Sequence, residues 1–121
     1  MKICLVIDDS PIIRTAARQI LEELAFFANE AGSGASALGA CRTAMPDAIL
    51  LDGAMPEMSG IDFLRFLRKE PGGAKPRVIY CPSENDTTQI GEALSAGADA
   101  CLLKPYDRED VSACLRRAGV I

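Results

Sequence analysis

Short apolar runs alternate with longer amphipathic segments along the whole chain. Four runs, at 3–7, 48–51, 78–81 and 100–103, are bounded and rich in branched residues. Runs of this length predict strands that are buried on both faces, as in a parallel sheet. A weaker run, Phe26-Phe27-Ala28, is the best candidate for a further strand, second in chain order. The apolar pattern therefore predicts five strands.

The segments between these runs carry apolar residues at helical spacing, three and four positions apart. Such spacing predicts helices that each bury one face. Segments 33–44 and 60–69 are two of the five predicted helices. The other three contain apolar stripes, which consist of Ile13, Ala16, Ala17, Ile20, Leu21 and Leu24, of Ile90, Ala93, Leu94 and Gly97, and of Val111, Cys114, Leu115 and Ala118.

Local signals support this order of elements. Ser10 is a candidate N-cap with Pro11 at the first helical position, and Asp107 can cap the last helix. Five strands that alternate with five helices predict an α/β fold, a doubly wound parallel sheet in three layers with helices on both faces. No repeat or linker interrupts the pattern, so residues 1–121 are predicted to form a single domain. In such sheets ligands bind beyond the carboxyl ends of the strands.

Composition and charge narrow the classes of function. Of the 121 residues, 49% are hydrophobic and 25% charged, as in an ordinary globular domain. The net charge of −4 gives no general attraction to nucleic acid or anionic lipid. No apolar segment approaches the roughly 18 residues of a membrane span, and the first apolar run meets two carboxylates too early for a signal peptide. We therefore expect a cytoplasmic protein.

The cysteines and the absence of histidine limit the kinds of metal and catalytic site that the chain can form. The cysteines lack the C-x-x-C spacing of zinc and redox sites, so we predict that most of them are small buried apolar residues. The chain has no histidine, which excludes histidine-based catalysis and histidine metal ligands. The five cysteines are Cys4, Cys41, Cys81, Cys101 and Cys114.

Three carboxylates follow two of the predicted strands. Asp8 and Asp9 come after the first strand and Asp52 after the third. Because parallel strands end at one edge of the sheet, these side chains should converge, and their repulsion favours a hard divalent cation such as Mg²⁺ or Mn²⁺. Lys104 ends the fifth predicted strand and can reach the same edge. One lysine and one divalent cation would then balance the three carboxylates.

Three motifs occur in order on this pattern. They are Val6-Ile7-Asp8-Asp9-Ser10, the segment Leu-Leu-Asp-Gly-Ala-Met-Pro-Glu-Met-Ser-Gly at 50–60, and Ala96-Gly97-Ala98-Asp99 leading to Lys104-Pro105-Tyr106. Each motif alone is a weak signal, but with these motifs together the chain resembles the receiver domains of two-component response regulators over nearly its whole length. The resemblance implies a flavodoxin-like sheet with strand order 2-1-3-4-5.

The resemblance also implies a role for each site residue. Asp52 would be the phosphoacceptor, attacking the phosphohistidine of a sensor histidine kinase or a phosphotransfer protein. Asp9 directly, and Asp8 partly through water, would hold Mg²⁺ together with Asp52 and the backbone carbonyl of Ala54. Lys104 would pair with Asp52 before transfer and with a phosphoryl oxygen afterwards. Such a domain is a signalling phosphoacceptor rather than an enzyme, and assists its own phosphorylation and dephosphorylation.

Two positions depart from the family pattern. Receivers end the fourth strand with Thr or Ser, whose hydroxyl binds the phosphoryl group. Here that position is Pro82, which has neither a hydroxyl nor a backbone N–H. Ser83 can supply a hydroxyl if the strand ends or bulges at Pro82. The Tyr or Phe of the fifth strand is replaced by Cys101, which is too small to report the same ring motion.

The main functional prediction is a stand-alone receiver that signals through protein–protein contacts and does not bind nucleic acid or membranes itself. Ile12, Thr15 and Gln19 on the first helix would face the kinase or phosphotransfer helix. An alternative is a degenerate receiver that works as a phosphorylation-independent adaptor, which Pro82 and Cys101 favour. A third reading, a metal-dependent phosphatase with an aspartyl-phosphate intermediate, ranks last because such enzymes usually carry an Asp-x-Asp motif and a cap.

Overall fold

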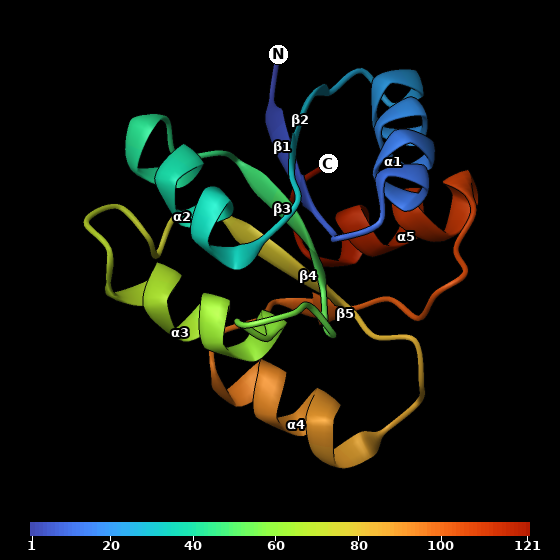
Figure 1. The fold of residues 1–121 in the computed structure, drawn as a ribbon. Helices are drawn as coiled ribbons and strands as arrows, with labels where there is room; N and C mark the ends of the chain where they lie inside the picture. The colour runs from blue at the N-terminus through green and yellow to red at the C-terminus, as the bar shows by residue number, and fades with distance from the viewer.

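Each apolar run forms a strand of one parallel sheet. In the computed structural model, which describes residues 1–121, neighbouring strands pair in parallel in the order β2-β1-β3-β4-β5 (Figure 1). The α/β class and the strand order expected from the sequence are confirmed. The strands are β1 (Ile3–Ile7), β2 (Phe27–Ala31), β3 (Ala48–Asp52), β4 (Arg77–Cys81) and β5 (Ala100–Cys101).

Five helices cover the two faces of this sheet. In Figure 1, α1 and α5 lie on one face and α2, α3 and α4 on the other, and the buried side chains form two matching cores. Successive strand residues alternate between these cores, which explains why the strands read as unbroken apolar runs. No helix is both long and apolar enough to cross a membrane. The helices are α1 (Pro11–Glu23), α2 (Gly34–Thr43), α3 (Gly60–Lys69), α4 (Thr87–Ser95) and α5 (Arg108–Arg117).

The predicted helix starts are confirmed by their capping bonds. The Ser10 hydroxyl accepts a hydrogen bond from the backbone N–H of Ile13, with Pro11 in the first turn of α1. Asp107 accepts one from the N–H of Asp110 in a reciprocal capping box at the start of α5. These bonds satisfy N–H groups that have no partner inside the helix. These capping bonds therefore set where α1 and α5 begin.

The edge strands differ most from the prediction. β2 begins at Phe27, not Phe26, and continues to Ala31, while β5 ends at Cys101, not at residue 103. Edge strands pair on one side only and expose part of their length, so their apolar signal is weaker. Leu94 was predicted to lie on the buried stripe of α4, but it is 47% exposed.

Gly60 allows α3 to approach the carboxyl end of β3. A Cβ atom at this position would collide with the backbone carbonyl oxygen of Asp52. We expect Gly60→Ala to lower the free energy of unfolding by about 2–3 kcal/mol, because the backbone of β3 cannot move aside cheaply. Urea titration of the two proteins measures this change.

A matched control lies in α2, where a Cβ atom at Gly39 would meet nothing within 4 Å. Gly39→Ala is expected to leave stability unchanged or to raise it, by up to about 1 kcal/mol, because alanine favours the helix. Equal effects of the two substitutions would contradict the close-approach role of Gly60.

Candidate acidic site

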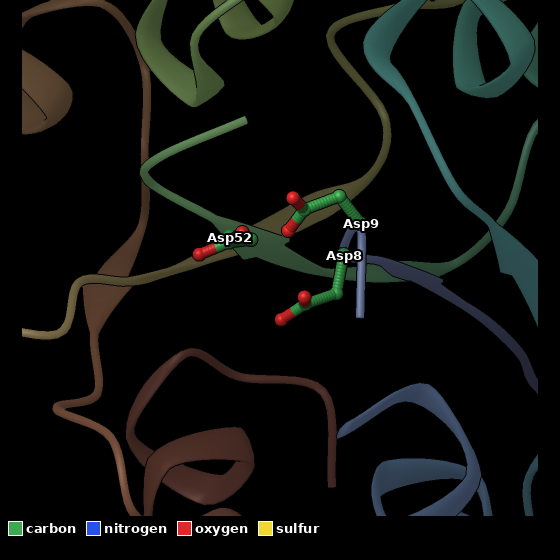
Figure 2. Close-up of side chains that lie close together, drawn as sticks. All are labelled: Asp8, Asp9 and Asp52. Atoms are coloured by element: carbon green, nitrogen blue, oxygen red, sulfur yellow. The ribbon is translucent and has the colours of Figure 1, made fainter. Parts of the chain in front are cut away.

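Three carboxylates meet at the carboxyl edge of the sheet. Asp8 and Asp9 follow β1, and Asp52 is the last residue of β3, and one oxygen from each lies within 4.8 Å of the others. In Figure 2, Asp8 and Asp9 extend to different sides of the β1 end, with Asp52 beside them. Asp8 and Asp52 are buried, at 3% and 5% exposure, whereas Asp9 is exposed. The structure therefore brings together the carboxylates that the sequence singled out.

Lys104 bridges the two buried carboxylates. Its Nζ atom lies 2.6 Å from Oδ2 of Asp8 and 2.9 Å from Oδ1 of Asp52. The pairing with Asp52 was expected from the resemblance, whereas the bond to Asp8 was not. Both are charge-assisted hydrogen bonds, which are shorter and stronger than neutral ones. The lysine thereby holds the carboxyl groups of two neighbouring strands in one arrangement.

The sequence placed Lys104 at the end of a strand, and this was wrong. β5 ends at Cys101, three residues earlier. The chain nevertheless stays beside β4, because the backbone N–H of Leu102 donates to the Tyr80 carbonyl at 2.9 Å and that of Lys104 to the Pro82 carbonyl at 3.0 Å. These two backbone hydrogen bonds lie beyond the regular pairing of β4 and β5. They hold the segment so that Lys104 reaches the acidic edge.

Burial and charge shift the ionisation of this pair. Burial raises the pKa of Asp52, and the charge of Asp8 adds to this, while the bond and charge of Lys104 oppose it. Burial alone would lower the pKa of Lys104, but the bonds to Asp8 and Asp52 outweigh it and the pKa is raised. The lysine therefore stays charged at neutral pH. It compensates only one of the negative charges around it.

The remaining partners hold Asp8 more firmly than Asp52. The N–H of Ser10 donates to Asp8 Oδ1 at 2.9 Å, and Arg14 donates to the Asp8 carbonyl at 2.6 Å. Asp52 accepts, besides the lysine, only a long bond of 3.4 Å from the N–H of Ala54. The Asp9 carboxylate accepts no hydrogen bond from the protein. Asp52 and Asp9 thus keep oxygen lone pairs for a ligand.

The donor set fits Mg²⁺. This ion prefers oxygen ligands and is usually held by one or two carboxylates beside several waters. Three carboxyl groups share one lysine here, so a divalent cation would find negative charge to balance. Ala54, whose carbonyl was named as a further ligand, is exposed two residues beyond Asp52. Mn²⁺ has the same ligand preference.

The two unusual positions and Ser83 lie around this edge. β4 ends at Cys81, so Pro82 follows the strand directly and is buried. Ser83 is exposed and makes no hydrogen bond to the acidic residues. Cys101 is partly buried, packs against the core under α2, α3 and α4, and lies opposite Tyr80 in the β4–β5 register.

Sequence reasoning missed Tyr80, which appeared only as part of an apolar run. Its side chain is 0% exposed, and its hydroxyl has no hydrogen-bond partner. A Cβ atom at Gly53 would lie 2.6 Å from that hydroxyl, so the hydroxyl rests against the residue that follows Asp52. The only signal in the sequence is a phenol in the otherwise apolar run 78–81, two positions before Pro82.

Comparison with known proteins identifies the family. The model of the response regulator receiver domain matches residues 4–116. The transcriptional regulatory protein KdpE of Mycobacterium tuberculosis is 39% identical over 118 residues, which cover 98% of this chain and 51% of KdpE. The chemotaxis protein CheY of Halobacterium salinarum is 33% identical over 107 residues, 88% of each chain.

A solved structure agrees over nearly the full length. The chemotaxis protein CheY4 of Vibrio cholerae superposes with a TM-score of 0.93 and 27% identity over 98% of both chains. The chain spans about half the length of KdpE and of other curated relatives it matches, and most of the length of CheY. The sequence match and the fold point to the same family. The chain belongs to the response regulator receiver domain family of two-component systems.

Proposed function

We propose that Asp52 accepts a phosphoryl group from the phosphohistidine of a sensor histidine kinase or histidine phosphotransfer protein. The domain would act in the cytoplasm as a phosphoacceptor that signals through protein–protein contacts. The observation that carries the proposal is the bridge from Lys104 Nζ to Asp52 Oδ1, at 2.9 Å, inside a cluster of three carboxylates. Receiver domains are signalling proteins, and a lysine paired with an aspartate in an acidic cluster supports phosphoryl transfer to that aspartate.

The transfer requires little covalent chemistry from the protein. A carboxylate oxygen of Asp52 attacks phosphorus, the P–N bond to the donor imidazole breaks, and the imidazole nitrogen keeps the electron pair. Lys104 then turns from the carboxylate to a phosphoryl oxygen. Asp8, Asp9, Asp52 and the Ala54 carbonyl would hold Mg²⁺, which supplies positive charge to the transferring group when bound. Positioning and charge neutralisation account for the catalysis.

The partner surface that we propose lies on α1. Ile12 is 83% exposed, and Thr15 and Gln19 beside it are also exposed. A shallow, mainly apolar pocket between α1 and the segment after β5 adjoins Lys104, and its lining includes Ile12 and Pro105. A partner helix seated there would place its phosphohistidine at the acidic edge. Large exposed apolar residues next to a charged site are typical of a protein-binding surface.

The acceptor is tested by incubation with acetyl phosphate and Mg²⁺ and measurement of the intact mass. We expect a phosphate-sized mass gain in the wild type, none in Asp52→Asn, and none after the metal is removed with EDTA. Asp62→Asn is the matched control, because Asp62 is an exposed aspartate at the start of α3, outside the acidic cluster. A gain that persists in Asp52→Asn would show that another group is phosphorylated.

A second candidate function is a phosphorylation-independent adaptor. Its support is that buried Pro82 and partly buried Cys101 occupy the positions that usually carry the switch residues. In that case wild-type protein would bind Mg²⁺, gain no mass with acetyl phosphate, and bind its partner equally well with and without the phosphodonor.

A further inference from the structure

The Tyr80 hydroxyl is the one buried side-chain polar atom that lacks a hydrogen-bond partner. Buried hydroxyls are almost always paired, because leaving a polar group unpaired away from water costs free energy. Tyr80 is fully enclosed, in the core beneath α2, α3 and α4. The enclosed phenol is therefore a donor that has no acceptor within the protein.

The hydroxyl lies at the carboxyl edge, next to the acceptor residue. It rests against Gly53, where an added Cβ atom would lie 2.6 Å from the phenol oxygen and 2.9 Å from ring carbon Cζ. Gly53 follows Asp52 directly in the chain, so the phenol lies against the backbone just beyond the end of β3. In the sheet, Tyr80 lies between Leu51 of β3 and Cys101 of β5.

The electrostatic surroundings keep this hydroxyl a donor. Burial raises the pKa of Tyr80 to about 12, and the groups that add to this are Cys101, Asp52, Glu92 and Asp86. The phenol is therefore protonated at neutral pH. Asp52 is at the end of β3, whereas Asp86 and Glu92 belong to the start and middle of α4. Tyr80 packs in the same core as Ala93 of α4.

We propose that the Tyr80 hydroxyl donates a hydrogen bond to a phosphoryl oxygen on Asp52, the bond for which Pro82 has no hydroxyl. This inference rests on the proposed function, since it needs Asp52 to be phosphorylated. A phosphoryl group adds three strong acceptor oxygens beside Gly53. Lys104 and the metal would account for two of them, and the buried phenol, which has no other partner, would serve the third. Ser83, the hydroxyl expected from the sequence, is exposed to solvent instead.

The proposal predicts opposite behaviour in the two states. Without phosphate, Tyr80→Phe removes an unsatisfied hydroxyl and keeps the ring, so stability should be unchanged or higher. With phosphate, the same substitution removes a hydrogen bond. If Tyr80 had a purely structural role, Tyr80→Phe would affect the protein equally with and without the phosphoryl group.

The test uses beryllofluoride with Mg²⁺ as a stable mimic of the phosphoryl group, followed in amide NMR spectra. We expect Tyr80→Phe to bind beryllofluoride about tenfold more weakly than wild type, the size of one lost hydrogen bond to a charged group. Urea unfolding without the mimic should show no loss of stability. Tyr106→Phe is the matched control, because Tyr106 is the only other tyrosine and should bind the mimic as wild type does.

A second readout is the near-ultraviolet absorption of tyrosine, which responds to hydrogen bonding of the phenol. The chain has no tryptophan, so the mimic-induced difference spectrum should persist in Tyr106→Phe and disappear in Tyr80→Phe. Wild-type affinity in Tyr80→Phe overturns the proposal, as does a loss of its stability without the mimic. If Ser83→Ala weakened beryllofluoride binding and Tyr80→Phe did not, the hydrogen bond to the phosphoryl group would come from Ser83 in the loop after β4. A wild type that neither binds beryllofluoride nor gains mass would refute the proposed function itself, and this inference with it.

Discussion

Lys104→Met is expected to lower the free energy of unfolding of the metal-free protein by about 3–5 kcal/mol at neutral pH. The substitution keeps a side chain of similar length but removes the charge between two carboxyl groups that are 4% and 5% exposed. Removing one partner of a buried ion pair is costly because the other charge stays buried without compensation. Here two carboxylates, Asp8 and Asp52, lose their shared cation. Urea titration in EDTA measures the loss.

Mg²⁺ should restore much of this stability, because it binds the folded acidic cluster and not the unfolded chain. We expect saturating Mg²⁺ to raise the unfolding midpoint of Lys104→Met more than that of the wild type. Lys75→Met is the control, since its partner Asp47 lies 3.6 Å away and the Lys75 side chain is 61% exposed. Exposed ion pairs of this kind contribute little to the free energy of unfolding. If the two variants lost stability equally, Lys104 would not be the cation that stabilises the cluster.

Alkaline pH is expected to destabilise the folded protein through its buried thiols. Burial raises the pKa of Cys4 to about 12 and that of Cys41 to about 11, and it raises the pKa of Cys81 as well. A thiol in the unfolded chain ionises near pH 8.5. Below that pH the thiols are neutral in both states and their contribution is constant. Above it only the unfolded chain loses protons, so the free energy of unfolding falls until the folded thiols ionise.

These three thiols alone should lower the free energy of unfolding by about 4 kcal/mol between about pH 7.5 and 9.5. Urea titrations across this range, with a reductant to prevent disulfides, measure the slope. Burial raises the pKa of Cys101 and Cys114 too, and these thiols add to the fall. Cys4→Ala removes one contributing thiol and should make the fall about 1.4 kcal/mol smaller, whatever it does to stability at neutral pH. Unchanged stability up to about pH 10 would mean that the folded thiols ionise as readily as the unfolded ones.

The sequence by itself determined the fold and which residues to examine. The alternation of apolar runs with amphipathic segments is enough for five strands and five helices, because both faces of a parallel sheet must be buried. Asp8, Asp9 and Asp52 could be grouped in advance, because parallel strands end at the same edge. Strand order came from the resemblance carried by the three motifs.

Only the tertiary structure decided how these groups meet. Lys104 and Asp8 are 96 positions apart, and their bond depends on how the segment after β5 runs beside β4. Tyr80 is enclosed because β4 lies between β3 and β5, and its hydroxyl fits against residue 53 because that residue is glycine. A one-dimensional pattern records which residues are apolar or charged, whereas contacts between distant segments are settled by packing, to within fractions of an ångström.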